Sequence, residues 1–267
     1  MEFKNKRTVT AETREQIEKV CEIWQKHLGE DLLGIYIHGS LALDSFKDEV
    51  SDIDMLIVVN RRIPGDTRLA IAKEIMEIDQ KPYPLEMSAL YIKDIVPWQY
   101  PTKCQFHYSN YWTEHYRQLL SEEVIPSILV DEDFEDMDIA CHVKLAKQCG
   151  MRVYGKPEEE IFPDVPEEDF WQSIYNEIDN YEFDLENPQC YGRNLLMLGR
   201  ILPYKLEKQI LTKHDAGVWT RYHIPKEYRY ITDNAVKVWF FGRAQVEYKP
   251  EDLEGLKTYL IDAIKKE

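Results

Sequence analysis

The chain has 267 residues, of which 44% are hydrophobic and 12% aromatic, and it carries a formal net charge of -16. This composition excludes a disordered or low-complexity protein, and the length suits one large domain or two modest ones. A surface this acidic argues against nucleic acid as a partner. It suits a cationic small molecule, although solubility alone explains such a charge more readily.

Helix and strand patterns alternate along the first part of the chain. Thr10 begins a helix with apolar residues at helical spacing, and Gly29 ends it. A second helix is predicted after the turn residues Pro64 and Gly65. Apolar runs predict buried strands at 32–37, 54–59 and 84–92.

The pattern becomes mostly helical after Trp98. QFHYS (105–109) predicts an edge strand, and 134–150 predicts a helix closed by Gly150. The stretch 154–169, with Gly155 and several prolines among acids, predicts an exposed connection. Helical patterns follow at 170–183, 190–207, 213–222, 226–242 and 250–266.

The order of these elements predicts two domains. We expect an α/β domain with a mixed sheet and flanking helices over residues 1–160, and an all-α helical bundle over residues 161–267. The charged start lacks an apolar core, and no apolar run approaches the roughly 20 residues of a spanning helix. Five scattered cysteines without C-x-x-C spacing suit a reducing compartment. We therefore expect a cytoplasmic monomer without a nucleic-acid or membrane partner.

Two short motifs flank the first two predicted strands. H-G-S (38–40) follows one strand, and S-D-I-D (51–54) leads into the next. Asp52 and Asp54 project to the same side of a strand, roughly 7 Å apart, because side chains alternate between its faces. Paired carboxylates of this kind suit Mg²⁺, which binds one or two carboxylates together with phosphate oxygens.

The glycine-serine pair suits the phosphates themselves. Gly39 permits a tight turn whose backbone N–H groups meet a phosphate, and Ser40 and Ser51 add hydroxyl donors. Taken alone, the first motif is more readily an ordinary turn, and the second a pair of strand-start acids. Their combination, with each motif next to an apolar strand, favours a nucleotide site.

These residues also carry a family resemblance. H-G-S followed by S-D-I-D and an apolar run resembles the polymerase-beta-type nucleotidyltransferase superfamily. Leu85-Glu86-Met87 resembles a strand of the aminoglycoside 3''/9-adenylyltransferases (streptomycin/spectinomycin adenylyltransferases). Leu198-Gly199-Arg200, with Lys213 thirteen residues after the arginine, resembles the pattern of their helical domain. The resemblance covers nearly the whole chain.

The resemblance implies an enzyme that uses ATP as co-substrate with Mg²⁺. A substrate hydroxyl attacks the α-phosphate and pyrophosphate leaves. Glu86 would be the general base, as the glutamate of the family strand is. Its parity on the strand opposes that of core-facing Leu85 and Met87, so its side chain would face the cleft. The remaining implied roles are metal binding by Asp52 and Asp54, and nucleotide binding by Gly39, Ser40, Ser51, Arg200 and Lys213.

The implied acceptor is an aminoglycoside or aminocyclitol antibiotic, spectinomycin or streptomycin, so that the enzyme confers resistance. Trp112 falls near the place where members that accept streptomycin carry a tryptophan. Several members place an aspartate shortly before the arginine, where this chain has residues such as Cys190. The acids that could replace it are Glu182, Asp184 and Glu186.

One departure concerns the phosphate loop. The family shows G-S-x-A-x-G, and Asp44 replaces the last glycine of that motif. If that position needs a positive φ, aspartate is a tolerable but poorer choice.

Two other functions stay open at this point. The acceptor could be another small molecule or a protein side chain, although the helical second domain favours the drug-modifying branch. The chain could also be a nucleotide-binding sensor that has lost catalysis. Intact Asp52, Asp54 and Glu86 argue against the sensor, which has no need of a base.

Overall fold

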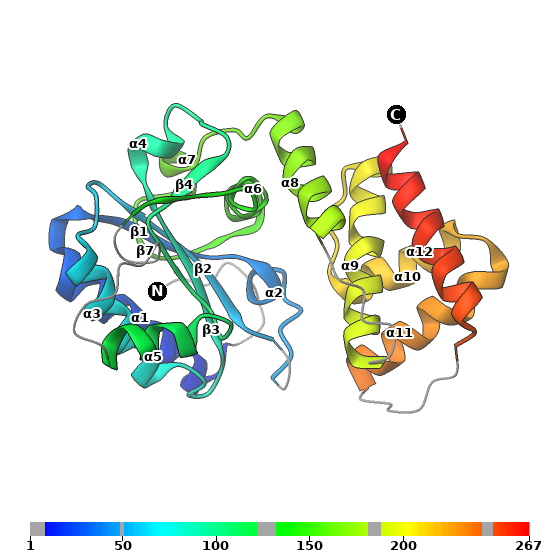
Figure 1. The fold of residues 1–267 in the computed structure, drawn as a ribbon, viewed down its shortest axis with the longest axis horizontal. Coiled ribbons are helices and arrows are strands. Elements are labelled where there is room, and N and C mark those ends of the chain that lie inside the picture. The colour runs from blue at the N-terminus through cyan, green and yellow to red at the C-terminus, as the bar shows by residue number, and fades with distance from the viewer. Residues whose placement is uncertain (1–8, 49–50, 122–131, 181–187, 242–247, 267) are drawn as a thin grey trace. The chain divides into compact units, whose positions relative to one another are not determined.

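The computed structural model describes residues 9–48, 51–121, 132–180, 188–241 and 248–266 (Figure 1). The chain divides into two compact units, Met1–Asn176 and Glu177–Glu267. The first has the predicted α/β architecture and the second is helical, which confirms the predicted fold class. The boundary predicted at residue 160 stays a prediction. Of the described helices, none combines the length and apolar character that a membrane crossing requires.

A mixed five-stranded sheet forms the centre of the first unit, in the order β5-β3-β2-β1-β7. Strand β1 (Leu32–Ile37) runs antiparallel to β2 (Ile53–Val59), and β2 runs parallel to β3 (Leu85–Tyr91). The edges are β5 (Phe106–Tyr108), predicted as an edge strand, and β7 (Met151–Gly155), both antiparallel to their neighbours.

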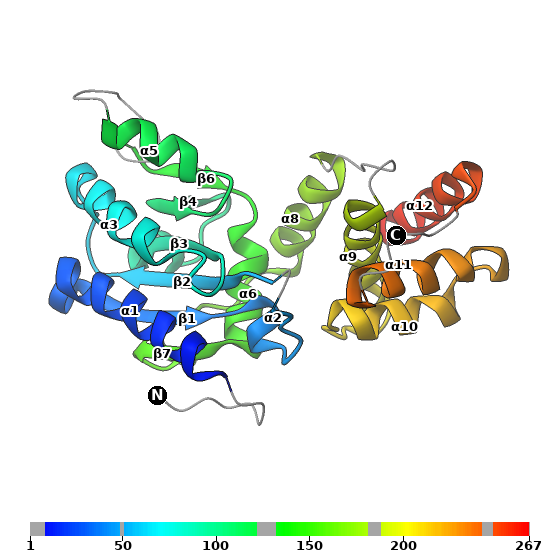
Figure 2. The same ribbon diagram turned by 90° about the horizontal axis from the view of Figure 1, so that it is seen from below.

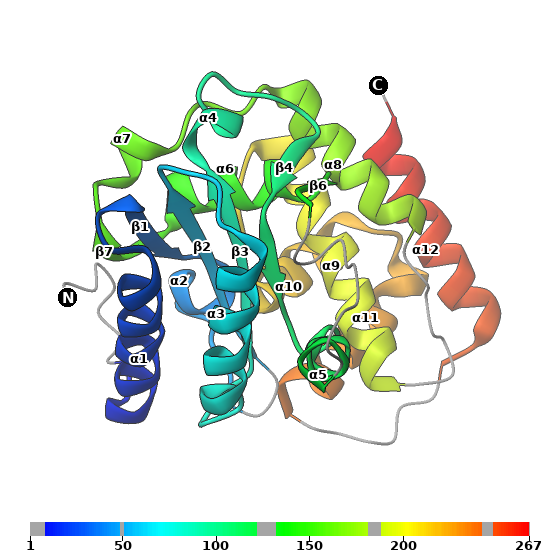
Figure 3. The same ribbon diagram turned by 60° about the vertical axis from the view of Figure 1, so that its left-hand side comes forward.

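Helices cover both faces of this sheet. Helices α1 (Ala11–Leu28), α3 (Gly65–Ile78) and α5 (Thr113–Ser121) lie on one side, and α6 (Ile139–Cys149) and α7 (Glu158–Ile161) on the other (Figures 1 and 3). As predicted, the Thr10 hydroxyl caps α1 by accepting from the Thr13 N–H. Two short helices, α2 (Gly39–Ala42) and α4 (Ile92–Ile95), follow β1 and β3.

The alternation along β2 and β3 separates the core from the candidate site. Ile53 and Met55 on β2, with Leu85 and Met87 on β3, belong to the buried core that packs with α1 and α3. Residues of opposite parity therefore face the side covered by α6. The expected orientation of Glu86, opposite to Leu85 and Met87, follows from this alternation.

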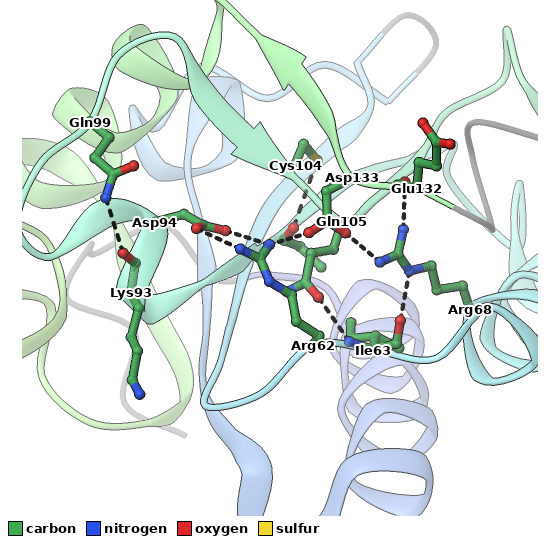
Figure 4. Close-up of polar contacts among 11 residues, drawn as sticks. Arg62, Ile63, Arg68, Lys93, Asp94, Gln99, Cys104, Gln105, Glu132 and Asp133 are labelled. Carbon is green, nitrogen blue, oxygen red and sulfur yellow. Dashed lines mark hydrogen bonds and ion pairs between the residues drawn. The ribbon is translucent and has the colours of Figure 1, made fainter.

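A polar network joins the loops that follow the carboxyl ends of β2 and β3 (Figure 4). Arg62 forms ion pairs with Asp133 and with Asp94. Nη2 of Arg62 donates to Oδ1 of Asp94 over 2.7 Å. The buried Arg68 pairs with Asp133 and donates from Nε to the Ile63 carbonyl over 2.8 Å. Both aspartates, Asp94 and Asp133, thus meet a guanidinium group.

The predicted helix over 134–150 is wrong at its start. Residues Phe134–Asp136 form strand β6, which pairs antiparallel with β4 (Thr102–Cys104), and the helix α6 begins at Ile139. The Asp136 carboxylate accepts from the Asp138 N–H over 2.9 Å, a turn contact that precedes the helix. Local helical spacing did not reveal the distant pairing partner.

The exposed connection predicted at 154–169 is also partly wrong. Tyr154 lies in edge strand β7, opposite Ile35, and Glu158 and Phe162 are buried. The Phe162 ring contacts Tyr36 with centroids 4.7 Å apart, and the Glu158 carboxylate accepts from the Arg152 N–H over 3.0 Å. Its polar composition concealed these tertiary contacts.

The helical patterns predicted for the second half of the chain are confirmed within the described residues, which leave out 181–183 and 242 of the predicted helices. Helix α8 (Glu167–Asn180) bridges the division between the two units. Pro188 and Pro250 occupy the first positions of α9 and α12, where proline is tolerated because no intrahelical N–H donor is lost. The later helices are α9 (Pro188–Glu207), α10 (Lys213–His223), α11 (Arg229–Phe241) and α12 (Pro250–Lys265).

Candidate active site

Gly39 is the first residue of the short helix α2, which follows β1 and lies near the start of β2 (Figure 2). The His38 N–H donates to the Asp54 carbonyl over 3.0 Å, which holds this turn against β2. Gly39 has φ +64°, and a Cβ on it would lie 1.9 Å from Oδ2 of Asp54. Both the backbone conformation and the space therefore require glycine, and the Asp54 carboxylate rests directly on the turn.

Three carboxylates converge next to this turn. Asp54 and Glu86 are direct partners in the parallel pairing of β2 with β3, and Asp52 precedes β2 on the same side. One oxygen from each of Asp52, Asp54 and Glu86 lies within 4.8 Å of the others. Oxygens bound to one Mg²⁺ lie at most about 4.2 Å apart, so the three groups fit this ion after a small adjustment.

The surroundings of Glu86 disfavour the charged form of its carboxyl group. Burial raises the pKa of Glu86, and the Asp52 carboxylate, through its charge and a hydrogen bond, raises it further. Asp136 adds to the increase, and His142 opposes it. A glutamate whose pKa is raised lies closer to the pH at which a general base works well.

The two serines differ in their surroundings. The Ser40 hydroxyl is buried and has no hydrogen-bond partner within the described part of the chain. An unpaired buried hydroxyl is costly, so it suits a ligand that supplies an acceptor or donor. The Ser51 hydroxyl accepts from the Lys47 N–H over 3.0 Å and so stabilises the loop before Asp52.

Asp44 has the positive φ that we considered for its position in the phosphate loop. Its φ is +57°, in the left-handed region. The aspartate therefore stands where a glycine would be relaxed, which confirms the conditional prediction for this position.

Two residues that sequence reasoning did not place here act on Glu86, and a third lies close to one of them. Asp136 on β6 and His142 on α6 both act on the pKa of Glu86. His142 also packs against the buried His38, with ring centroids 4.8 Å apart. Burial, and then Asp136, raise the pKa of Asp138 to about 6. The acidic run F-E-D-M-D (134–138) could have indicated these acids, but we assigned the whole run to a helix.

The predicted acceptor residues are placed only in part. Trp112 lies just before α5, packs against the core of the first unit, and contacts the Tyr111 and His115 rings at centroid distances of 5.1 and 5.9 Å. The predicted acids Glu182, Asp184 and Glu186 lie outside the described residues.

Arg200 and Lys213 belong to the second unit. Arg200 lies on α9 and donates from Nε to the Leu211 carbonyl over 3.2 Å, two residues before Lys213. Lys213 is the first residue of α10, and its ammonium lies over the Trp239 ring, 4.8 Å from the centroid. The two predicted cations are thus linked through the segment that joins α9 to α10.

Comparison with known families matches both parts of the chain. A nucleotidyltransferase domain model matches residues 13–110, and a model of the aminoglycoside adenylyltransferase C-terminal domain matches residues 160–263. The first match contains the three converging carboxylates, and the second contains Arg200 and Lys213.

Full-length relatives agree with both matches. An aminoglycoside (3'') (9) adenylyltransferase of Shigella flexneri is 26% identical, with 97% of each chain covered. A spectinomycin 9-adenylyltransferase of Enterococcus faecalis is 29% identical over 97% of this chain and 99% of its own length. The chain thus combines a nucleotidyltransferase domain with the C-terminal domain of the aminoglycoside adenylyltransferases. It is therefore an enzyme of the nucleotidyltransferase class.

A solved structure of a family member shares this fold. It is a spectinomycin adenyltransferase from Enterococcus, crystallised with ATP and spectinomycin. The TM-score is 0.76 at 28% identity, with 95% of this chain and 99% of the other covered. The fold of that protein thus extends over both units, and the family resemblance of the chain is confirmed.

Proposed function

We propose that this enzyme transfers AMP from ATP to a hydroxyl of spectinomycin or streptomycin, with Mg²⁺ bound, and so confers resistance. The observation that carries the proposal is the convergence of Asp52, Asp54 and Glu86 beside the Gly39 turn. The printed names of the relatives and the ATP and spectinomycin in the solved structure support the choice of substrates.

Asp52 and Asp54 would hold Mg²⁺, which neutralises charge on the transferring and leaving oxygens when it is bound. Glu86 accepts the proton of the acceptor hydroxyl as its oxygen attacks the α-phosphorus. The bond from that phosphorus to the pyrophosphate oxygen breaks, and pyrophosphate leaves. Gly39, Ser40 and Ser51 orient the triphosphate, with the unpaired Ser40 hydroxyl as the direct contact.

Arg200 and Lys213 would bind the phosphates of ATP. We expect Lys213→Ala to weaken ATP binding at least about tenfold, because a charge-assisted phosphate contact contributes about 1.5–3 kcal/mol. Calorimetric titration of the folded variant with ATP and Mg²⁺ measures this. Unchanged binding removes Lys213 from the site.

The acceptor residues remain proposals. Trp112 would form part of the wall for the antibiotic, because an aromatic ring suits an amphipathic cyclitol. Glu182, Asp184 and Glu186 would bind its cationic groups. The acidic Asp136 next to Glu86 would favour the same cationic class of acceptor.

Mass spectrometry of the antibiotics tests the proposal directly. Spectinomycin and streptomycin are each incubated with enzyme, ATP and Mg²⁺, and the product is examined for an added AMP. Glu86→Gln, which keeps the shape of the side chain, should retain ATP binding and lose transfer. ATP binding without an AMP adduct on either antibiotic would refute the proposed acceptors; pyrophosphate release with another acceptor would then identify the alternative.

A further inference from the structure

Three helices of the second unit approach one another very closely. A Cβ on Gly217 of α10 would lie 2.6 Å from Val236 on α11 and 2.8 Å from Leu196 on α9. The Thr220 hydroxyl, one turn further along α10, donates to the Gly199 carbonyl of α9 over 3.1 Å. This packing fixes how the three helices present their remaining side chains to one another.

Lys213 lies on the packed face of α10, four residues before Gly217 and seven before Thr220. Residues at this spacing share one side of a helix. Its side chain therefore points towards α11, where Trp239 stands one turn beyond the buried Ala235. The ammonium lies over the indole ring, 4.8 Å from the centroid. This is the geometry of a cation–π contact, and tryptophan is the ring that attracts a cation most strongly.

The chemistry of this contact suits a lysine that serves a phosphate. A carboxylate partner would also hold the ammonium, but its negative charge would repel the triphosphate. An indole face attracts the ammonium without adding negative charge. It also restricts a flexible four-carbon side chain before the ligand arrives, so less conformational entropy is lost on binding.

We propose that Trp239 is a positioning residue that holds the Lys213 ammonium where it meets the phosphates of ATP. The inference rests on the proposed role of Lys213 in nucleotide binding. The simpler role for Trp239 is to fill the interface between α10 and α11. The two roles differ in one measurable respect, because only positioning makes the effect of Trp239 depend on Lys213.

A double-mutant cycle on the full chain separates the two roles. ATP binding is titrated calorimetrically with Mg²⁺ for the unmodified chain, Trp239→Leu, Lys213→Met and the double variant. We expect Trp239→Leu to weaken binding about fivefold, as the loss of one cation–π contact predicts. In the Lys213→Met chain the same substitution should change binding less than about twofold.

A matched control lies on α10. Trp219 stacks on His223 with ring centroids 3.5 Å apart, and its indole nitrogen donates to Glu207. Trp219→Leu removes a tryptophan of the same unit and should leave ATP affinity within about twofold. If Trp239→Leu does not yield folded protein, Trp239→Phe replaces it. Because phenylalanine attracts a cation less strongly, this variant should bind ATP about twofold more weakly, again only when Lys213 is present.

Equal losses with and without Lys213 would overturn the inference, as would unchanged ATP affinity in Trp239→Leu or in Lys213→Met. These measurements need no acceptor. A failure to adenylylate spectinomycin and streptomycin would therefore refute the proposed acceptors and leave the result on Trp239 unaffected.

Discussion

Carboxylates gather at both ends of the parallel strands β2 and β3, but their surroundings differ. After the strands end, Asp94 and Asp133 meet the guanidinium groups of Arg62 and Arg68 (Figure 4). Where the strands begin, Asp52, Asp54 and Glu86 meet one another, and the pKa of Glu86 is raised. The first group is neutralised by the chain itself, and the second favours an added cation.

This difference separates a structural cluster from a candidate binding site. A buried ion pair holds loops in place and resists the loss of either partner. Like charges held together by two adjacent strands cost stability until something cationic binds, and such a cost persists mainly at functional sites. Acidic composition alone does not distinguish the two ends; the nature of the neighbouring groups does.

The largest expected effect is the loss of catalysis in Asp54→Asn. Removing a metal-binding carboxylate should lower the rate of AMP transfer at least about a thousandfold, since metal-ion catalysis contributes several kcal/mol. Stability without Mg²⁺ should stay the same or rise, because like-charge repulsion is relieved. Transfer rates and urea unfolding measure both. Glu18→Gln on the exposed side of α1 is the control, and a markedly less stable Asp54→Asn would contradict the comparison.

A substitution in the ion-pair network that follows β2 and β3 should lower stability and leave catalysis unchanged. Arg68→Met leaves Asp133 with one guanidinium fewer and should lower the free energy of unfolding by about 3 kcal/mol, with the transfer rate of the folded enzyme changed less than about twofold. Arg117, whose ion pair with Glu114 is exposed, is the matched control; Arg117→Met should cost less than about 1 kcal/mol. Similar unfolding midpoints for the two variants would show that the network is not structural.

The sequence predicts one of these ends and not the other. Asp52, Asp54 and Glu86 stand on apolar strands next to a recognisable glycine turn, so strand parity alone indicates that they share a side. Arg62 and Asp133 are separated by 71 positions and lie in loops. No period relates them, and only the folded arrangement brings them together.

The same reason explains the errors in the fold. Long periodic segments such as α1 and the helices of the second unit are predictable from local pattern. Strands β6 and β7 are short, and their residues are fixed by partners elsewhere in the chain. The misassigned start of 134–150 therefore concealed that Asp136 lies close enough to act on Glu86 and on Asp138.

Asp138 gives a smaller test of charge at that end. Its pKa is raised to about 6 from an ordinary value of 3.8, so the folded state disfavours its charged form. The cost is absent below pH 3.8 and complete above about pH 6. Asp138→Asn should therefore be about 1–2 kcal/mol more stable than the unmodified chain at pH 7.5, with a gap that closes as the pH falls towards 4. Urea unfolding across this range measures the gap. Glu135→Gln, an exposed neighbour, is the control, and a gap independent of pH would exclude charge as the cause.

The smallest expected effect separates backbone strain from charge in the turn before Asp52 and Asp54. Asp44 has φ +57°, and Gln80, outside this turn, has φ +59°. Glycine at either position adopts a positive φ without the steric strain that a Cβ causes, although it also raises the conformational entropy of the unfolded chain. Each variant should therefore gain up to about 0.5 kcal/mol in unfolding free energy. Asp44→Gly also removes a negative charge from the phosphate loop, so it alone should tighten ATP binding, by about twofold to threefold. Equal ATP affinity in Asp44→Gly and Gln80→Gly would mean that the Asp44 carboxylate does not act on the triphosphate, and that its replacement of glycine concerns the backbone alone.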